Sequence, residues 1–94
     1  MVMSQWFLYI ARARTDRYYV GITTEPDRRI QDHNKGKGSR MAVNQGPFTL
    51  AYVSPPLADQ STARKREMEV KGWTRAKKKK LIKGEIEWAQ TFLV

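Results

Sequence analysis

The first quarter of the chain contains two mainly apolar stretches that are typical of β-structure. Residues 5–13 (QWFLYIARA) and 17–23 (RYYVGIT) are rich in aromatic and branched side chains, and a short polar interval separates them. Such residues favour strands, and two strands joined by a short polar interval are typical of a hairpin. The pattern therefore predicts a β-hairpin whose turn lies near Thr15 and Asp16.

A short helix is predicted directly after the hairpin, within residues 23–38. Thr24 is a residue type suited to an N-cap and is followed three positions later by Asp27. Pro26 would lie in the first turn, and Gly36 is placed to end the helix. These signals predict a helix of about three turns.

Residues 48–54 (FTLAYVS) predict a third strand. Phe48, Leu50 and Tyr52 alternate with smaller residues, which predicts that these three share one side of the strand. The two prolines that follow would end it, because proline cannot donate a hydrogen bond to a neighbouring strand.

Two more helices and a tail are predicted after the prolines. Asp59 is placed to cap a helix that ends at Gly72, and Thr74 to cap another that ends at Gly84. The last ten residues (EIEWAQTFLV) are apolar enough to dock against the rest of the chain. The order of elements predicts an α+β fold, a small antiparallel sheet covered by helices. Its length suits a single domain over residues 1–94, with a core at about 5–83 and a tail at 84–94.

The net charge of the chain indicates the kind of partner that it binds. Lys and Arg total 18 against 9 Asp and Glu, a formal net charge of +9, which favours nucleic acid or an acidic membrane surface. A membrane partner is disfavoured because no stretch combines a broad apolar face with the lysines. The N-terminal apolar run of five residues, 6–10, predicts neither a signal peptide nor a membrane span.

The residue types that are missing restrict the chemistry. Without cysteine there is no disulfide, no thiolate-bound zinc and no cysteine nucleophile, and a reducing cytoplasm is the expected location. A single histidine excludes a histidine cluster. Any metal would therefore be a hard, oxygen-liganded ion such as Mg²⁺, held by few protein ligands and several waters.

Two residues of the first predicted helix are candidates for binding an anion. Arg29 and His33 are four positions apart and share a face, whereas Ile30 points elsewhere, toward the core. The planar guanidinium donates two parallel hydrogen bonds to a phosphate. The same two residues also fit an exposed, solvated helix face.

The predicted helix between Asp59 and Gly72 contains two glutamates in different environments. Glu67 shares a stripe with Ala63 and Val70, so its carboxylate faces the apolar side. Such a group needs either a metal or an ion pair with a basic neighbour, and both interpretations stay open. Glu69 points away from that stripe and has Arg66 and Lys65 as neighbours, which predicts a surface salt bridge.

Four short motifs occur in an order that resembles a known family. They are FLY at 7–9, YVG at 19–21, DRRIQDHN at 27–34 and AxxxE at 63–67. The chain resembles the GIY-YIG nuclease superfamily over residues 5 to about 83, and is similar to its small stand-alone bacterial members. The first motif lacks the usual Gly and Ile. The resemblance implies a three-stranded antiparallel sheet flanked by helices and a single-metal phosphodiesterase site.

The resemblance also implies roles for particular residues. Tyr9 and Tyr19 would face the site, Arg29 would clamp the scissile phosphate, and Glu67 would hold Mg²⁺ or Mn²⁺. Tyr9 is the expected general base, with His33 as the alternative. Sequence-independent contacts with the DNA backbone are expected from the basic residues Lys35, Lys37, Arg40, Lys77, Lys78, Lys79 and Lys80.

Two functions follow from this resemblance. The first is a metal-dependent DNA endonuclease, structure-selective and acting in DNA repair or recombination. The second is a nucleic-acid-binding module that keeps the fold but has little or no catalytic activity. Tyr9, Tyr19, Arg29, His33 and Glu67 together favour the enzyme, because a module that only binds needs no more than a basic surface.

Overall fold

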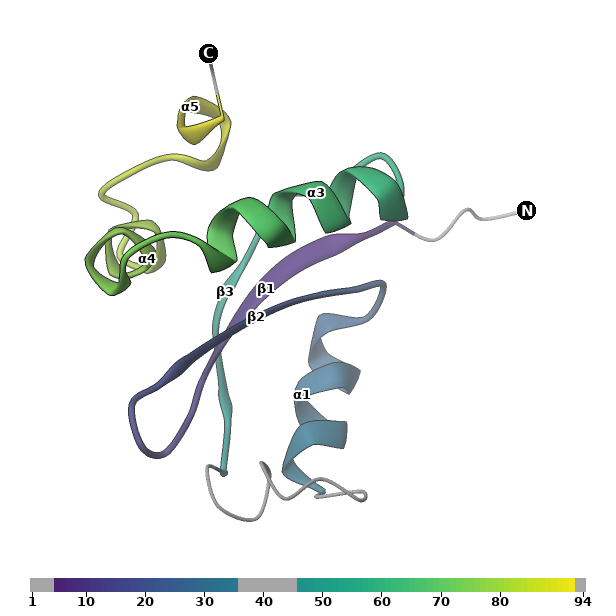
Figure 1. Ribbon diagram of the computed structural model, residues 1–94. Helices are drawn as coiled ribbons and strands as arrows, with labels where there is room; N and C mark the ends of the chain where they lie inside the picture. Colours follow the sequence, from purple (N-terminus) through teal and green to yellow (C-terminus); the bar gives the residue numbers. More distant parts are fainter. Residues whose placement is uncertain (1–4, 36–45, 93–94) are drawn as a thin grey trace.

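The centre of the fold is a three-stranded antiparallel sheet, seen in a computed structural model that describes residues 5–35 and 46–92 (Figure 1). Its strands are β1 (Phe7–Arg12), β2 (Tyr18–Thr23) and β3 (Thr49–Val53). They are arranged in the order β2-β1-β3, so β1 is central and β2 is an edge strand. The predicted α+β fold with a small antiparallel sheet is confirmed.

The β1–β2 hairpin has the predicted turn. The backbone N–H of Ala13 donates to the carbonyl of Arg17, and the N–H of Asp16 donates to the carbonyl of Ala13. Asp16 has a φ of 72°, in the left-handed region that aspartate tolerates better than most residues. The short polar side chain at this position thus lets the chain reverse direction.

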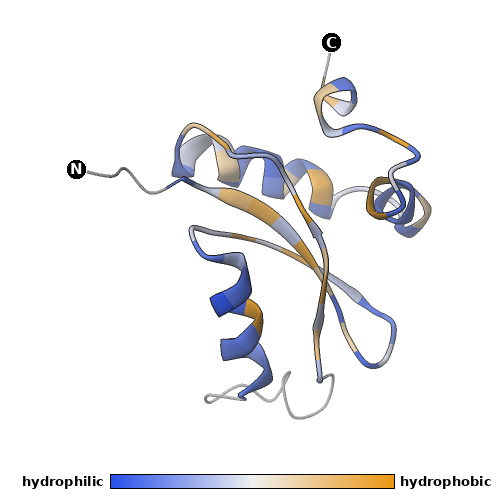
Figure 2. Ribbon diagram, turned by 180° about the vertical axis from the view of Figure 1, so that it is seen from behind, coloured by the Kyte–Doolittle hydropathy of each residue, from blue (hydrophilic) through white to orange (hydrophobic). Residues whose placement is uncertain are grey.

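Helices cover both faces of the sheet. Successive residues of a strand point to opposite faces, so Leu8 and Ile10 pack on one side and Tyr9 on the other. The first face is covered by α3 (Gln60–Lys71) and α4 (Arg75–Ile82), and the second by α1 (Pro26–Asn34). Figure 2 shows that α1 is hydrophilic along most of its length, in keeping with a helix that buries only a narrow stripe.

The third strand departs from the predicted alternation. Opposite the consecutive β1 residues Ile10 and Ala11 lie Tyr52 and Leu50, so Ala51 is one residue too many for a regular ladder. A shift of one residue moves the following side chains to the other face of a sheet. Leu50 accordingly packs on the α1 face and Tyr52 on the α3 face. The expectation that they share one side is wrong.

The start of α1 also differs from the prediction. Its N-cap is Glu25 rather than Thr24, and no side chain caps the helix. Proline is favoured at the first helical position because it lacks an N–H, and Pro26 occupies that position. The neighbouring Thr23 hydroxyl instead accepts a hydrogen bond from the Glu25 N–H at 3.1 Å. Gly36, predicted to end this helix, lies outside the described residues.

The predicted caps of the next two helices are confirmed. The Asp59 carboxylate accepts a hydrogen bond from the backbone N–H of Thr62 at 2.7 Å, and α3 ends with Gly72 as its C-cap. The Thr74 hydroxyl accepts from the backbone N–H of Lys77 at 3.2 Å, and α4 ends just before Gly84.

The C-terminal tail docks as predicted, through the short helix α5 (Trp88–Thr91). The Trp88 ring stacks on Tyr52 with centroids 6.3 Å apart, and Phe92 lies between the rings of Trp88 and Trp73, at 4.6 and 5.9 Å. The Arg66 guanidinium covers the Phe92 ring at 4.3 Å. The tail thus extends the hydrophobic core on the α3 side of the sheet.

One close approach decides where the side chain of Tyr9 lies. Tyr9 pairs with Gly21 across the β1–β2 ladder, and its ring lies over the glycine. A Cβ atom on Gly21 would be 2.5 Å from the Tyr9 hydroxyl oxygen and 2.6 Å from ring atom Cζ. These separations are far below van der Waals contact, so only glycine leaves room for the ring.

We therefore expect Gly21→Ala to displace the Tyr9 ring and to lower the free energy of unfolding by about 1–3 kcal/mol. Chemical denaturation measures the loss. Gly72→Ala is the matched control, because its Cβ would meet nothing closer than the Glu69 carbonyl at 3.4 Å. That variant should be within about 1 kcal/mol of the wild type. Equal stability of the two variants would show that the ring does not need Gly21.

Candidate active site

A cleft of about 550 Å³ lies along the edge strand β2. Its lining includes all five residues predicted to form the site, namely Tyr9 from β1, Tyr19 from β2, Arg29 and His33 from α1, and Glu67 from α3. The catalytic roles of these residues remain predictions. What the fold provides is their convergence on one cleft from four separate elements.

The cleft reaches both faces of the sheet because β2 has no neighbour on one side. Tyr19 of β2 packs on the α1 face, and Val20 and Ile22 pack on the α3 face, yet all three line the cleft. Helix α1 packs on one face of the sheet, against β1 and β3, and α3 packs on the other, against β2 and β1. Arg29 and Glu67, which lie on opposite sides of the sheet, therefore open into one space.

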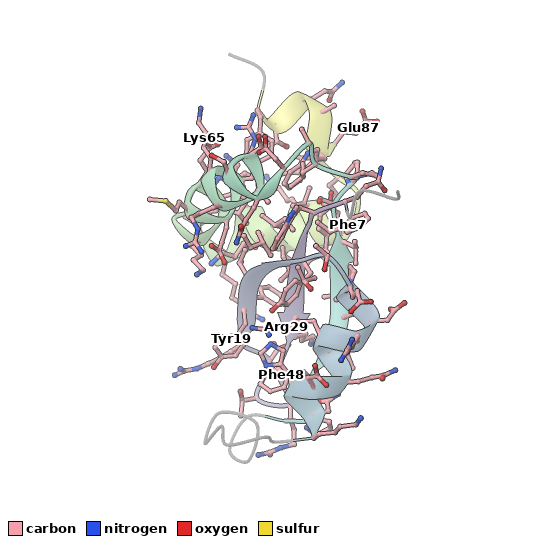
Figure 3. The ribbon with its side chains drawn as sticks, turned by 90° about the vertical axis from the view of Figure 1, so that its right-hand side faces the viewer. Phe7, Tyr19, Arg29, Phe48, Lys65 and Glu87 are labelled. Carbon is pink, nitrogen blue, oxygen red and sulfur yellow. The ribbon has the colours of Figure 1, made fainter. Side chains whose placement is uncertain are left out.

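The α1 side of the cleft is built from packed aromatic rings. The ring of Phe48 lies 5.7 Å from that of Tyr19, edge to face, and 5.5 Å from the imidazole of His33. Figure 3 shows Tyr19, Arg29 and Phe48 close to one another beside α1. The Asn34 side chain donates to the carbonyl of Phe48 at 2.8 Å and accepts from its N–H. These two hydrogen bonds fix the end of α1 against the start of β3.

The hydroxyl of Tyr9 meets the imidazole of His33. The Tyr9 Oη and His33 Nε2 atoms are 3.3 Å apart. Burial lowers the pKa of His33 below 6.5, and the charge of Arg29 lowers it further, whereas Asp32 acts in the opposite direction. The imidazole is therefore neutral at pH 7. With its proton on Nδ1, its Nε2 accepts a hydrogen bond from the tyrosine.

Neighbouring arginines on α1 have different partners. Arg28 forms an ion pair with Glu25 at 3.3 Å. The guanidinium of Arg29 lines the cleft and has no hydrogen-bond or ion-pair partner in residues 5–35 and 46–92. A permanently charged fork without a partner, directed into a cleft, is suited to binding an anionic ligand.

The two glutamates of α3 lie where the helical periodicity predicts. Glu67 belongs to the side of α3 on which Ala63 and Val70 are buried, and only 13% of its side chain is exposed. Its carboxylate is 3.5 Å from the ammonium of Lys71. Glu69 forms an ion pair with Arg66 at 3.1 Å, as predicted. Glu67 therefore forms an ion pair and also lines the cleft.

Two cations of the cleft were not among the predicted site residues. Arg64 and Lys71 line it with Arg29 and Lys78, so the lining contains four Lys and Arg side chains and one carboxylate, that of Glu67. Arg64 precedes Glu67 by three residues and Lys71 follows it by four, which places all three on one helix face. That spacing is the signal from which both could have been predicted.

The site cannot form an all-protein cage for a metal in the part of the chain that is described. No group of three His, Asp or Glu side chains there is close enough to hold an ion. Mg²⁺ often takes only one or two carboxylates, together with water and phosphate oxygens. One largely buried carboxylate at a water-accessible cleft fits that mode of binding.

The predicted backbone-binding residues fall into separate groups. Lys78 lines the cleft, whereas the ammonium of Lys77 lies 4.2 Å above the ring of Trp73. Lys35 is exposed at the end of α1, and Lys79 and Lys80 are exposed on α4. The remaining two, Lys37 and Arg40, lie outside the described residues.

Comparison with known proteins shows which family the sequence resembles. Residues 5–80 match the GIY-YIG catalytic domain. The chain belongs to the GIY-YIG family. The UPF0213 protein YhbQ of Escherichia coli O1:K1 is 41% identical over 80 residues, which cover 85% of this chain and 79% of that protein. YhbQ of Shigella boydii serotype 18 matches to the same extent.

Two solved structures share the fold. The solution NMR structure of the UPF0213 protein BH0048 from Bacillus halodurans has a TM-score of 0.53 and 34% identity, over 84% of this chain and 83% of that one. That of EF2693 from E. faecalis has a TM-score of 0.58 and 29% identity, over 87% and 86%. In this chain, none of the described helices is long and apolar enough to cross a membrane.

The single histidine of this GIY-YIG protein makes its titration directly observable. We expect the imidazole NMR signals to titrate with a midpoint below 6.5. Arg29→Gln should raise that midpoint, because one nearby positive charge is gone, but burial should still hold it below 6.5. Arg28→Gln is the control and should leave the midpoint unchanged.

The lowered pKa of His33 also makes the free energy of unfolding depend on pH. The unfolded chain binds the imidazole proton more readily than the folded one, so the free energy of unfolding falls as pH drops through 6.5. A midpoint above 6.5 in the wild type would contradict the burial of His33.

Proposed function

We propose that this protein is a metal-dependent endonuclease that hydrolyses phosphodiester bonds in DNA. The observation that carries the proposal is the convergence of Tyr9, Tyr19, Arg29, His33 and Glu67 on one cleft. Membership of the GIY-YIG family supports a nuclease and a nucleic-acid substrate. The excess of cations in the cleft supports an anionic substrate. Structure-selective cleavage and a part in DNA repair or recombination remain predictions.

Arg29 is the residue that we assign to the scissile phosphate. Hydrolysis of a phosphodiester adds negative charge to the phosphate oxygens in the transition state. A guanidinium that is already in place stabilises that charge more than it stabilises the substrate. Because Arg29 has no other partner in the described structure, it does not have to break an existing ion pair to do so.

Tyr9 and His33 provide a path for the proton of the attacking water. Tyr9 accepts that proton as its own hydroxyl proton passes to Nε2 of the neutral imidazole, 3.3 Å away. The low pKa of His33 keeps the imidazole ready to accept at neutral pH. This arrangement combines the expected base, Tyr9, with its alternative, His33, in one relay. Tyr19, held edge to face against Phe48, forms the adjacent wall.

Glu67 is the residue that would hold Mg²⁺ or Mn²⁺. When bound there, the ion supplies Lewis-acid stabilisation to the phosphate and to the departing 3′-oxygen. Lys71 must then release the carboxylate. Because 56% of the Lys71 side chain is exposed, its ammonium returns to water at little cost.

The ion pair between Lys71 and Glu67 also favours a second function. If the carboxylate serves only to fix Lys71 in the cleft, the protein is a nucleic-acid-binding module with little or no catalysis. The two functions make different predictions for the same substitution, because only the enzyme needs the charge of Glu67 for a metal.

For the enzyme, Glu67→Gln should abolish Mg²⁺-dependent cleavage of plasmid and branched DNA while DNA binding is kept. Mn²⁺ binding, measured by calorimetry, should be lost with it. Glu69→Gln is the matched control, since its partner Arg66 lies away from the cleft and exposed ion pairs contribute only about 0–1 kcal/mol. The melting temperature of both variants should stay close to that of the wild type.

Three results would remove the metal assignment. These are a large drop in melting temperature for Glu67→Gln alone, equal loss of cleavage in both variants, or unchanged Mn²⁺ binding. Wild-type protein that binds DNA but cleaves none of plasmid, branched and single-stranded substrates, with either metal, would favour the binding module.

Arg29→Ala should lower the cleavage rate by about 10²-fold, because one preorganised donor at a transition state contributes about that much. DNA affinity should fall much less. Arg28→Ala removes the same group from the next position, where the guanidinium is paired with Glu25 outside the cleft. Single-turnover rates of the two variants test the assignment, and similar rates would contradict it.

A further inference from the structure

A second, smaller cavity lies next to the cleft, between the hairpin and α4. It has a volume of about 240 Å³ and is lined by Arg17, Tyr18, Tyr19, Arg75 and Lys78. We call it the hairpin–α4 cavity. Tyr18, Tyr19 and Lys78 also line the cleft, so the two hollows share one wall. A ligand that is longer than the cleft can therefore continue into the second cavity.

The fold holds the walls of this cavity together through Arg75. The guanidinium of this first residue of α4 lies 4.1 Å above the ring of Tyr18 and donates to the carboxylate of Asp16 at 2.9 Å. The same carboxylate accepts from Arg12 at 2.7 Å. The turn of the hairpin is thus tied to α4, and Figure 1 shows both on the same side of the molecule. Arg75 is a structural part of the wall.

The other two cations of the cavity, Arg17 and Lys78, do not hold the wall together in this way. Within residues 5–35 and 46–92, the side chains of Arg17 and Lys78 have no hydrogen-bond or ion-pair partner. The nearby carboxylate of Asp16 is already bound by two arginines. The cavity therefore carries positive charge without a free counter-charge from the described residues, beside two tyrosine rings that offer apolar contact. This combination matches a phosphate with its sugar.

We propose that the hairpin–α4 cavity binds the phosphate next to the scissile one, on the side of the DNA strand that runs from the cleft toward α4. Arg17 contacts that phosphate, and Lys78 contacts the backbone where the two hollows meet. The inference rests on the proposed function, since it takes the cleft as the place of the scissile phosphate. It gives the strand one path across the protein, along β2 and away from α1.

The proposal separates residues that the sequence presents as equivalent. In the run 77–80, Lys78 lines both hollows, and none of the other three lysines lines either. Lys83, the C-cap of α4, lies five positions on, about 140° around the helix axis, is exposed and lines neither hollow. Lys78→Gln and Lys83→Gln thus remove the same charge from different sides of α4. Arg17→Gln tests the cavity alone, because Arg17 does not line the cleft, and Arg28→Gln is its control.

The first measurement is the binding of fluorescein-labelled DNA, by anisotropy, in EDTA and between about 50 and 200 mM salt. Lys78→Gln and Arg17→Gln should each lower the affinity by about fivefold near 0.1 M salt. Each should also reduce the slope of log K against log salt by about 0.7–0.9, the value of one released counterion. Lys83→Gln and Arg28→Gln should change the affinity by less than about twofold. Melting temperatures should be unchanged, because these side chains do not lie in the core.

The second measurement places the contact on the DNA. Single methylphosphonates, which remove the charge of one phosphate, are introduced at successive positions on both sides of the cleavage site. Neutralising one neighbouring phosphate, on one side only, should weaken the wild type severalfold and Arg17→Gln hardly at all. Equal losses on both sides, or equal sensitivity of the wild type and Arg17→Gln, would overturn the proposal.

The outcomes also distinguish this inference from the nuclease. If the wild type cleaves DNA while Arg17→Gln binds as Arg28→Gln does, the cavity is not a phosphate site and the nuclease assignment stands. If the wild type cleaves nothing while Arg17→Gln and Lys78→Gln bind more weakly than their controls, the cavity is a phosphate site of a binding module. The assignment of its phosphate as the neighbour of a scissile one then fails.

Discussion

The site depends on the space above Gly21, which lets the ring of Tyr9 cross from the central strand to the edge of the sheet. Tyr9 is buried on β1, but its ring extends over Gly21 of β2 and its hydroxyl reaches His33 on α1. A side chain on Gly21 would occupy the same space. Because Gly21 has no Cβ atom, the hydroxyl of a core tyrosine reaches the edge strand. The ionisable side chains of α1 and α3 line the same cleft there.

The edge position of β2 explains how one small sheet serves both sides of the site. Arg29 and His33 come from the helix on one face, and Glu67 comes from the helix on the other. A strand with neighbours on both sides would separate them. The hydrophobic clusters on the two faces hold α1 and α3 in place, and Asn34 ties the end of α1 to the start of β3.

The large positive charge of the chain has two distinct uses. Arg12, Arg28, Arg66 and Arg75 are bound to carboxylates, and they fix the turn, the helices and the tail. Arg17, Arg29 and Lys78 line the two hollows without partners in the described structure. Cations of the second kind gain most from an anionic ligand, because no hydrogen bond or ion pair within residues 5–35 and 46–92 has to be broken. Net charge alone predicts a polyanionic ligand. The positions of Arg17, Arg29 and Lys78 indicate where that ligand binds.

The sequence by itself determined what depends on the geometry of a single element. Helical spacing put Arg29 and His33 on one face and separated Glu67 from Glu69, and local capping chemistry predicted Asp59 and Thr74. The ordered motifs predicted the family and five of the residues that line the cleft.

Only the tertiary structure decided what depends on contacts between distant elements. Strand pairing placed an extra residue at Ala51 and sent Tyr52 to the other face, and the docking of α4 on the hairpin selected Lys78 from four adjacent lysines. Periodicity along a chain is local, whereas register and docking depend on the partner, so no pattern within one segment can predict them.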